Sequence, residues 1–237
     1  MPNTYKITIK NKTGVMQNYH FFSSPPAVSG GTFGIIWSNV LKAANDTPDG
    51  GVASLQIANN YYAVCGSFDG APESGSSVTI GKTVPVTLGA RVGGEVTMGS
   101  TVTLVVNHRT ACDLKAPETP GKGKLGAFEI DTSYEKGNEF TVQDAKINHL
   151  LVGIATSKDS DIHSAMGTFS PYPNVKYQVQ PQLVFYVSAG ESFDVGALVK
   201  VEMMASTQAV DFAKRQTMLR DSKKGLAAMK GNKETTR

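Results

Sequence analysis

Cysteine, histidine and tryptophan are scarce in this sequence, and each scarcity excludes a class of protein. Two cysteines in 237 residues cannot build a small disulfide scaffold. The four histidines show no metal-ligand spacing among themselves, and the calcium-loop pattern of an EF-hand is absent. The glycine-rich stretches 91–94 and 121–124 are not followed by a helical pattern, which a phosphate loop requires. We therefore expect no metal and no cofactor.

Long hydrophobic runs are also missing. The longest, residues 147–155, is interrupted by polar residues and is far shorter than the roughly 18 residues that a membrane helix needs. The chain begins with Met1 and enters an alternating pattern at once, without a basic and then apolar leader. We expect a cytoplasmic protein in which Cys65 and Cys112 are free thiols. Secretion stays open if a leader was removed.

Charge is divided unevenly along the chain. Residues 213–237 carry eight lysines and arginines against Asp221 and Glu234, a net charge of +6. The whole chain is +3, so residues 1–212 carry −3. A basic segment attracts phosphate, and a membrane surface is one partner that this C-terminal tail permits. Nucleic acid is not favoured, because the tail contains no aromatic residue on which bases would stack.

Alternation of apolar and polar residues is the dominant pattern of the remaining chain. Tyr5, Ile7 and Ile9 alternate with polar residues, which is typical of a strand with one buried face. Turn signals recur roughly every eight to twelve residues, the spacing of a sandwich. We predict an all-β protein, an antiparallel β-sandwich (one large or two small) of roughly a dozen strands over residues 1–212. The proline- and glycine-rich segment 113–126 is the candidate sub-domain boundary. Gln143 to Leu151 is the one candidate helix, and the tail 213–237 is expected to be weakly helical or disordered.

Nucleophilic catalysis finds little support. His108, Cys112 and Asp113 lie within six residues, and a cysteine nucleophile needs a base and a group that orients it. Closeness in sequence is no evidence that these side chains meet, and a turn histidine beside a small buried cysteine is ordinary. The Gly-x-Ser-x-Gly motif of hydrolases does not occur. We assign no catalytic residue.

A polar cluster is expected near residue 160. On an extended segment Asp159, Asp161 and His163 project to one face, where two carboxylates and an imidazole are able to bind a cation. A polar loop leading into a strand explains the same residues more simply. We therefore predict Asp161 and His163 as polar ligand-binding residues and no metal site.

Aromatic residues supply the remaining candidates. Tyr61 and Tyr62 are adjacent, so a strand would place their rings on opposite faces. Tyr172 lies in a proline-rich turn, and Trp37, the single tryptophan, follows a glycine-rich connection that favours exposure. Tyrosine and tryptophan rings stack on sugars and on apolar molecules. We predict that Trp37, Tyr61, Tyr62 and Tyr172 stack on a ligand.

Three classes of function follow from these patterns. The sequence favours a non-enzymatic, lectin-like recognition protein for a carbohydrate, a small apolar molecule or a protein partner, and a homo-oligomer is compatible with it. A cofactor-free cyclase or isomerase with an apolar pocket is the alternative. A self-assembling or membrane-active β-protein is the second alternative.

Overall fold

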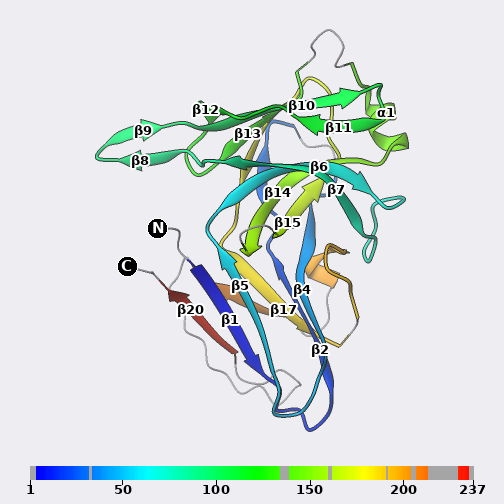
Figure 1. Ribbon diagram of the computed structural model, residues 1–237, viewed down its shortest axis with the longest axis vertical. Coiled ribbons are helices and arrows are strands. Elements are labelled where there is room, and N and C mark those ends of the chain that lie inside the picture. Colours follow the sequence, from blue (N-terminus) through cyan, green and yellow to red (C-terminus); the bar gives the residue numbers. More distant parts are fainter. Residues whose placement is uncertain are drawn as a thin grey trace.

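Nearly all of the regular secondary structure in the described chain is β-strand, as the alternating sequence predicted (Figure 1). The computed structural model describes residues 4–31, 34–133, 139–159, 162–190, 192–203, 207–212 and 229–234. The strands outnumber the expected dozen because several of them, such as β3 (Ala27–Ser29) and β18 (Leu198–Val199), are only two or three residues long.

The largest sheet runs in the order β19-β17-β2-β4-β15-β14-β6-β7, with β18 paired to β4. All of its pairings are antiparallel. Its other strands are β2 (Gln17–Ser23), β4 (Trp37–Thr47), β6 (Tyr61–Phe68), β7 (Val78–Val86), β14 (Leu150–Asp159), β15 (Ile162–Phe169), β17 (Val184–Ala189) and β19 (Gln208–Asp211).

A second sheet lies across β6 and β7 and runs in the order β11-β10-β13-β16-β3, with β12 paired to β10 (Figure 1). Its strands besides β3 are β10 (Gly99–Asn107), β11 (Ala111–Leu114), β12 (Glu118–Gly123), β13 (Phe128–Asp131) and β16 (Lys176–Gln180). The pairing of β10 with β13 is parallel and departs from the antiparallel rule that the sequence suggested.

Two smaller sheets complete the fold. One has the order β20-β1-β5 and contains β1 (Thr4–Lys10), β5 (Val52–Ala58) and β20 (Met229–Glu234). The other is the hairpin of β8 (Ala90–Val92) and β9 (Glu95–Thr97), which projects from the molecule and is exposed along its whole length (Figure 1). A 3₁₀ turn, η1 (Val201–Met203), follows β18.

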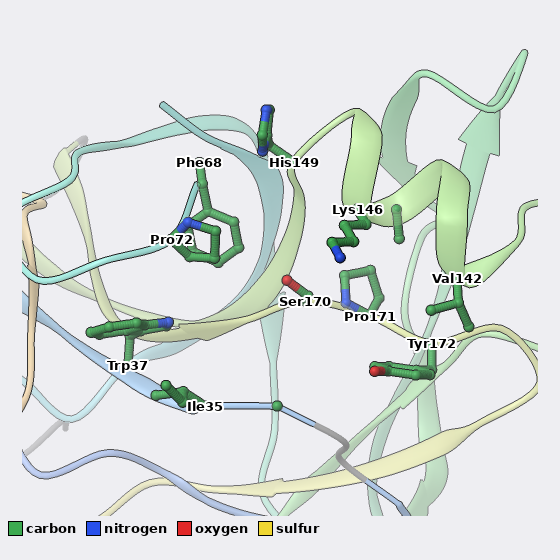
Figure 2. A pocket seen from close by; sticks show the side chains of 12 residues that line it. Ile35, Trp37, Phe68, Pro72, Val142, Lys146, His149, Ser170, Pro171 and Tyr172 are labelled. Atoms are coloured by element: carbon green, nitrogen blue, oxygen red, sulfur yellow. The ribbon is translucent and has the colours of Figure 1, made fainter. Parts of the chain in front are cut away.

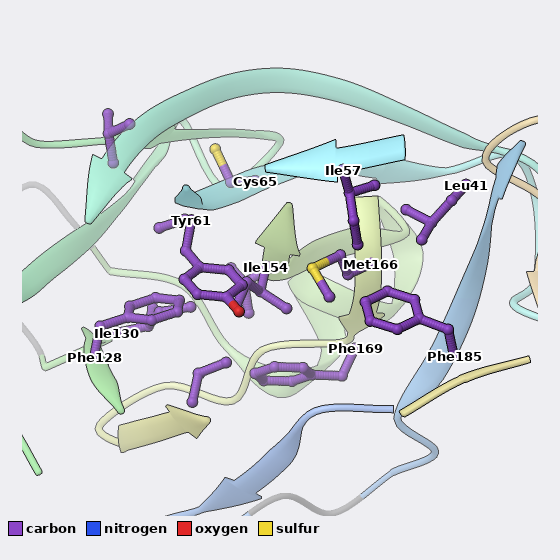
Figure 3. Packing of buried hydrophobic residues seen from close by; sticks show 14 of the residues in the cluster. Leu41, Ile57, Tyr61, Cys65, Phe128, Ile130, Ile154, Met166, Phe169 and Phe185 are labelled. Carbon is purple, nitrogen blue, oxygen red and sulfur yellow. The ribbon is translucent and has the colours of Figure 1, made fainter. Parts of the chain in front are cut away.

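One continuous core joins the three larger sheets. Tyr5, Ile7 and Ile9 of β1 are all buried, as their alternation predicted. They belong to a cluster that also contains aromatic side chains from the large sheet and from the second sheet, among them Phe169, Phe185 and Phe128 (Figure 3). Each fully buried side chain of this size stabilises the fold by about 1.5–3 kcal/mol. This shared core makes the fold a β-sandwich.

The helix α1 (Val142–Ile147) occupies part of the segment in which a helix was expected. Thr141 caps it in a reciprocal box: the Thr141 hydroxyl accepts the backbone N–H of Asp144 at 3.1 Å, and the Asp144 carboxylate accepts the backbone N–H of Thr141 at 2.8 Å. The helix ends earlier than the expected Leu151 because β14 begins at Leu150.

The structure describes the candidate sub-domain boundary at 113–126 and part of the C-terminal tail 213–237. Segment 113–126 contains the end of β11 and the whole of β12, and buried residues on both sides of it, Leu104 and Phe128, belong to the same core cluster. Within the tail, residues 229–234 form the edge strand β20, which pairs with β1 through main-chain hydrogen bonds that require no apolar pattern. The expected weak helix otherwise lies outside the described residues.

None of the helices in the described residues is long and apolar enough to cross a membrane.

Candidate functional site

A pocket of about 310 Å³ opens where β4 begins, β6 ends and α1 meets β14 (Figure 2). We call it the Trp37 pocket. It is lined by twelve residues from four separate stretches of the chain: Gly34, Ile35, Trp37, Phe68, Pro72, Val142, Ala145, Lys146, His149, Ser170, Pro171 and Tyr172. The volume lies at the lower end of the range for small-molecule sites, about 300–1,000 Å³.

Trp37 forms a fixed wall of the pocket. Its ring is only 3% exposed and packs in a small buried cluster with Phe68, Leu151 and Leu198. The ammonium of Lys200 lies 5.1 Å from the Trp37 ring centroid, within the range of a cation–π interaction. Because this ring is held on several sides, a ligand meets a surface that is already in place.

Tyr172 lies at the opposite end of the pocket from Trp37 and Phe68 (Figure 2). Its side chain is half-buried, and its backbone is anchored twice. The backbone N–H of Tyr172 donates to the Tyr177 hydroxyl at 2.8 Å, and its carbonyl accepts the Thr132 hydroxyl at 2.6 Å. Burial raises the pKa of Tyr177 to about 12, so this hydroxyl stays protonated at neutral pH. The loop that carries Tyr172 is therefore held by the core beneath it.

The polar groups of the pocket are Lys146, His149 and Ser170. Lys146 is in the last turn of α1, and His149 directly follows the C-cap residue Asn148. His149 has a φ of 51°, a left-handed conformation that is common just after a helix end. Its backbone N–H donates to the carbonyl of Lys146 at 3.3 Å, and its carbonyl accepts the N–H of Phe68 at 2.8 Å. The helix end thus holds the backbone of Lys146 and His149 at one rim of the pocket.

The pocket contains a basic side chain and no acidic one. None of the twelve lining residues is acidic, and Lys146 makes no ion pair with any residue that the structure describes. The remaining lining residues are apolar or aromatic, apart from His149 and Ser170. This arrangement suits a molecule that has an apolar body and a negative group at one end.

The residues predicted from the sequence as ligand-stacking groups divide between three places. Trp37 and Tyr172 both line the Trp37 pocket, although Trp37 is buried and does not lie open after the glycine-rich connection as expected. Tyr61 is a correction: it is 8% exposed and belongs to the core, where burial raises the pKa of its hydroxyl. Because adjacent residues of a strand point to opposite faces, the ring of Tyr62 faces the other side of β6. Tyr61 does not line the Trp37 pocket, whereas Trp37, although also buried, does.

Tyr62 and His163 meet at a separate place on the large sheet. Their ring centroids are 3.8 Å apart, and the Thr83 hydroxyl shares a hydrogen bond of 3.0 Å with Nδ1 of His163. Asp161, the other predicted polar residue, lies outside the described residues. Nowhere in the described part of the chain do three histidine, cysteine or acidic side chains gather as metal ligands would.

Several pocket residues were not found from the sequence. Phe68, Lys146 and His149 come from the end of a strand and the end of a short helix, and nothing in their spacing links them to Trp37 or Tyr172. The only usable signal was aromatic residues beside glycine- and proline-rich turns, and it selected Trp37 and Tyr172.

Comparison with known proteins gives no independent indication of function. No family model matches the chain, and no curated protein or solved structure shows significant similarity to it. Function must therefore be inferred from the pocket itself.

Proposed function

We propose that this protein is a non-enzymatic recognition protein, and that it binds a small molecule with an apolar body and an anionic group in the Trp37 pocket. The observation that carries the proposal is the composition of the pocket. Aromatic and aliphatic walls surround it, and Lys146 is the one lysine, arginine or acidic residue in its lining. Among the ligands expected from the sequence, this composition favours a small apolar molecule over a carbohydrate, which needs a larger number of hydrogen-bonding groups.

The apolar part of the ligand would lie between Trp37 and Tyr172. Trp37 and Phe68 are buried at one end, and Pro171, also buried, backs the other end. Apolar surface that is removed from water on binding contributes about 25 cal/mol per Å². A volume of about 310 Å³ restricts the ligand to a compact molecule or to part of a longer one.

The anionic part would face Lys146. Two unit charges 4 Å apart attract by about 1 kcal/mol in water and by about 4 kcal/mol near a protein surface. Because Lys146 is exposed, the weaker attraction of about 1 kcal/mol is the appropriate value. The cation therefore orients the ligand and selects its charge, and the apolar walls supply most of the affinity.

A binding role fits the pocket better than catalysis does. A histidine base usually needs a carboxylate or another acceptor that fixes its tautomer, and no acidic residue lines the pocket beside His149. The cofactor-free enzyme remains the alternative function, since His149 and Ser170 both line the pocket. Conversion of the bound molecule, detected by mass spectrometry of the released ligand, would favour that alternative.

The single tryptophan allows a direct test. Because Trp37 is the only tryptophan and lines the pocket, its fluorescence reports on this site alone. We expect 1-anilinonaphthalene-8-sulfonate, an aromatic anion, to quench Trp37 saturably, and native mass spectrometry to show one molecule bound per chain. Unchanged Trp37 emission would contradict the proposal. Binding of several probe molecules per chain without saturation would contradict it as well.

A further inference from the structure

The two cysteines are brought together from different sheets. Cys65 lies in β6 of the large sheet, and Cys112 lies in β11 of the second sheet, which packs against β6 and β7. The Cys112 thiol donates to the carbonyl of Gly66, the residue after Cys65, at 3.2 Å. It also lies 4.0 Å from the carbonyl of Leu151 on β14. Cys112 therefore points at the segment that carries Cys65.

The local backbone allows this approach. A β-bulge interrupts the pairing of β6 with β7 between Cys65 and Gly66. Gly66 has no space for a side chain, because an added Cβ would overlap the carbonyl oxygen of Thr79. The bulge and the glycine together turn the carbonyl of Gly66 toward Cys112.

An ion pair holds the same junction. Lys82 is the partner of Cys65 in the β6–β7 pairing, and its ammonium lies 2.7 Å from the carboxylate of Asp113, the residue after Cys112. The ion pair thus ties β11, which carries Cys112, to β7, which pairs with β6 beside Cys65. The thiols would therefore meet without a rearrangement of the sheets.

The two thiols differ in burial and acidity. Both are free, but Cys65 is fully buried and Cys112 is half-buried. A hydrogen bond from the Cys65 thiol lowers the pKa of Cys112, and backbone hydrogen bonds act in the same direction. The same thiol–thiol hydrogen bond and burial both raise the pKa of Cys65. Cys112 is therefore the thiol that ionises first and that reagents reach first.

We propose that Cys65 and Cys112 form an oxidation site, at which a hydroperoxide converts the two thiols into a disulfide that ties β6 to β11. This inference is independent of the Trp37 pocket. In the first step the Cys112 thiolate attacks one peroxide oxygen, which forms a sulfenic acid and breaks the O–O bond. The departing oxygen takes up a proton and leaves as water when the oxidant is hydrogen peroxide.

In the second step the Cys65 sulfur attacks the Cys112 sulfenic sulfur. The S–O bond breaks, and the hydroxyl leaves as water with the proton of the Cys65 thiol. In total, two thiols and one hydrogen peroxide give one disulfide and two waters. The peroxide is reduced and the two sulfurs are oxidised, so the balance needs no other reactant.

The test uses the full chain, reduced and then treated with hydrogen peroxide before remaining thiols are alkylated. We expect an intact mass that is lower by two hydrogen atoms, no alkylation, and a single Cys65–Cys112 peptide after digestion. The disulfide closes a loop of the unfolded chain, so the oxidised protein should melt about 5–10 °C higher than the reduced one. Two alkylated thiols after peroxide treatment, or a disulfide between two chains, would overturn the proposal.

Serine variants assign the order of events. Cys65→Ser should stop at the Cys112 sulfenic acid, which dimedone traps, whereas Cys112→Ser should leave the buried Cys65 unmodified. Dimedone labelling of Cys65 in the second variant at the rate of Cys112 in the first would contradict the assigned roles. If either variant fails to fold, the peptide map of the unmodified sequence still decides whether the disulfide forms.

Discussion

The ring of Tyr62 lies 3.8 Å from the imidazole of His163, measured between centroids, with an angle of 33° between the two planes. Tyr61, its neighbour in the chain, has its ring in the core. Two adjacent tyrosines therefore face opposite sides of one strand, and only Tyr62 is partly accessible. Neither ring belongs to the Trp37 pocket, which makes Tyr62 a useful control for the pocket residue Tyr172.

Removal of the Tyr172 ring should weaken binding in the Trp37 pocket. We expect Tyr172→Ala to raise the dissociation constant of 1-anilinonaphthalene-8-sulfonate by about tenfold, because an aromatic contact is worth about 0.5–1.5 kcal/mol beyond its buried area. The measurement is a titration of Trp37 fluorescence. Tyr62→Ala removes a ring of the same type outside the pocket and should leave the dissociation constant unchanged. Equal effects of the two variants would place the probe elsewhere.

Lys146 should discriminate between charged and neutral ligands. Octanoate and octanol share an apolar chain and differ in their head groups, so their affinities separate the contribution of charge. We expect Lys146→Met to weaken octanoate by about fivefold and to leave octanol unchanged, as the loss of one charge pair of about 1 kcal/mol implies. Isothermal titration calorimetry measures both ligands.

The same titration separates the two parts of the proposed function. If octanoate and octanol bind the unmodified protein equally and Lys146→Met changes neither, the anionic part of the ligand is wrong while the apolar pocket stands. If neither molecule binds and 1-anilinonaphthalene-8-sulfonate leaves Trp37 unchanged, the pocket is not a binding site.

The sequence predicted most of the fold because alternation is a direct record of which face is buried. Tyr5, Ile7 and Ile9 alternate with polar residues, and all three are in the core. The same rule predicted that Tyr61 and Tyr62 face opposite sides, although it did not say which of them faces inward. The parallel pairing of β10 with β13 left no trace in the sequence, because the choice of neighbour is made by packing between distant segments.

The candidate site was less accessible to prediction for the same reason. Trp37, Lys146 and Tyr172 are far apart in the chain and line one pocket only because the start of β4, the end of α1 and the loop after β15 lie at one edge of the fold. Lys146 reads as an ordinary exposed residue of a short helix. Cys65 and Cys112 likewise show no spacing motif, since they are joined by the packing of two sheets.

The ion pair of Asp113 with Lys82 should make stability depend on pH in the acid range. The hydrogen bond and charge of Lys82 lower the pKa of Asp113 below its ordinary value. A carboxyl group whose pKa is lower when folded contributes stability that is present above its unfolded pKa, and the contribution disappears as pH falls below about 4. Both side chains are almost half exposed, so the contribution is small, about 0.2–1 kcal/mol.

Asp113→Asn tests this contribution. The variant keeps the oxygen that accepts the Leu114 N–H at 2.7 Å and removes only the charge. Urea unfolding should show it to be less stable than the unmodified protein at pH 7, with a difference that shrinks toward pH 3. Glu95→Gln, on the exposed β8–β9 hairpin, is the matched control and should show no such trend. A difference that grows on acidification would mean that the charge destabilises the fold.

Gly153 should be essential for the close approach of β14 and β15. A Cβ at this position would overlap the carbonyl oxygen of Gly167 on β15 and lie 2.9 Å from the Cα of Thr168. Both are backbone atoms, so the strands must separate to accept a methyl group. We expect Gly153→Ala to destabilise the protein by about 1–3 kcal/mol, as overpacking does. Thermal and urea unfolding measure the change.

Gly81→Ala is the matched control, because it changes the same residue type in β7 of the same sheet. The nearest atom to its added Cβ, the carbonyl oxygen of Cys65, is 3.7 Å away, which is an ordinary contact. This variant should be neutral or slightly more stable, since alanine reduces the freedom of the unfolded chain. Gly153→Ala should also disturb the Trp37 pocket, because Thr168, beside the overlap, pairs with Trp37 across β15 and β4. A Gly153→Ala protein as stable as Gly81→Ala would show that β14 and β15 lie further apart than described.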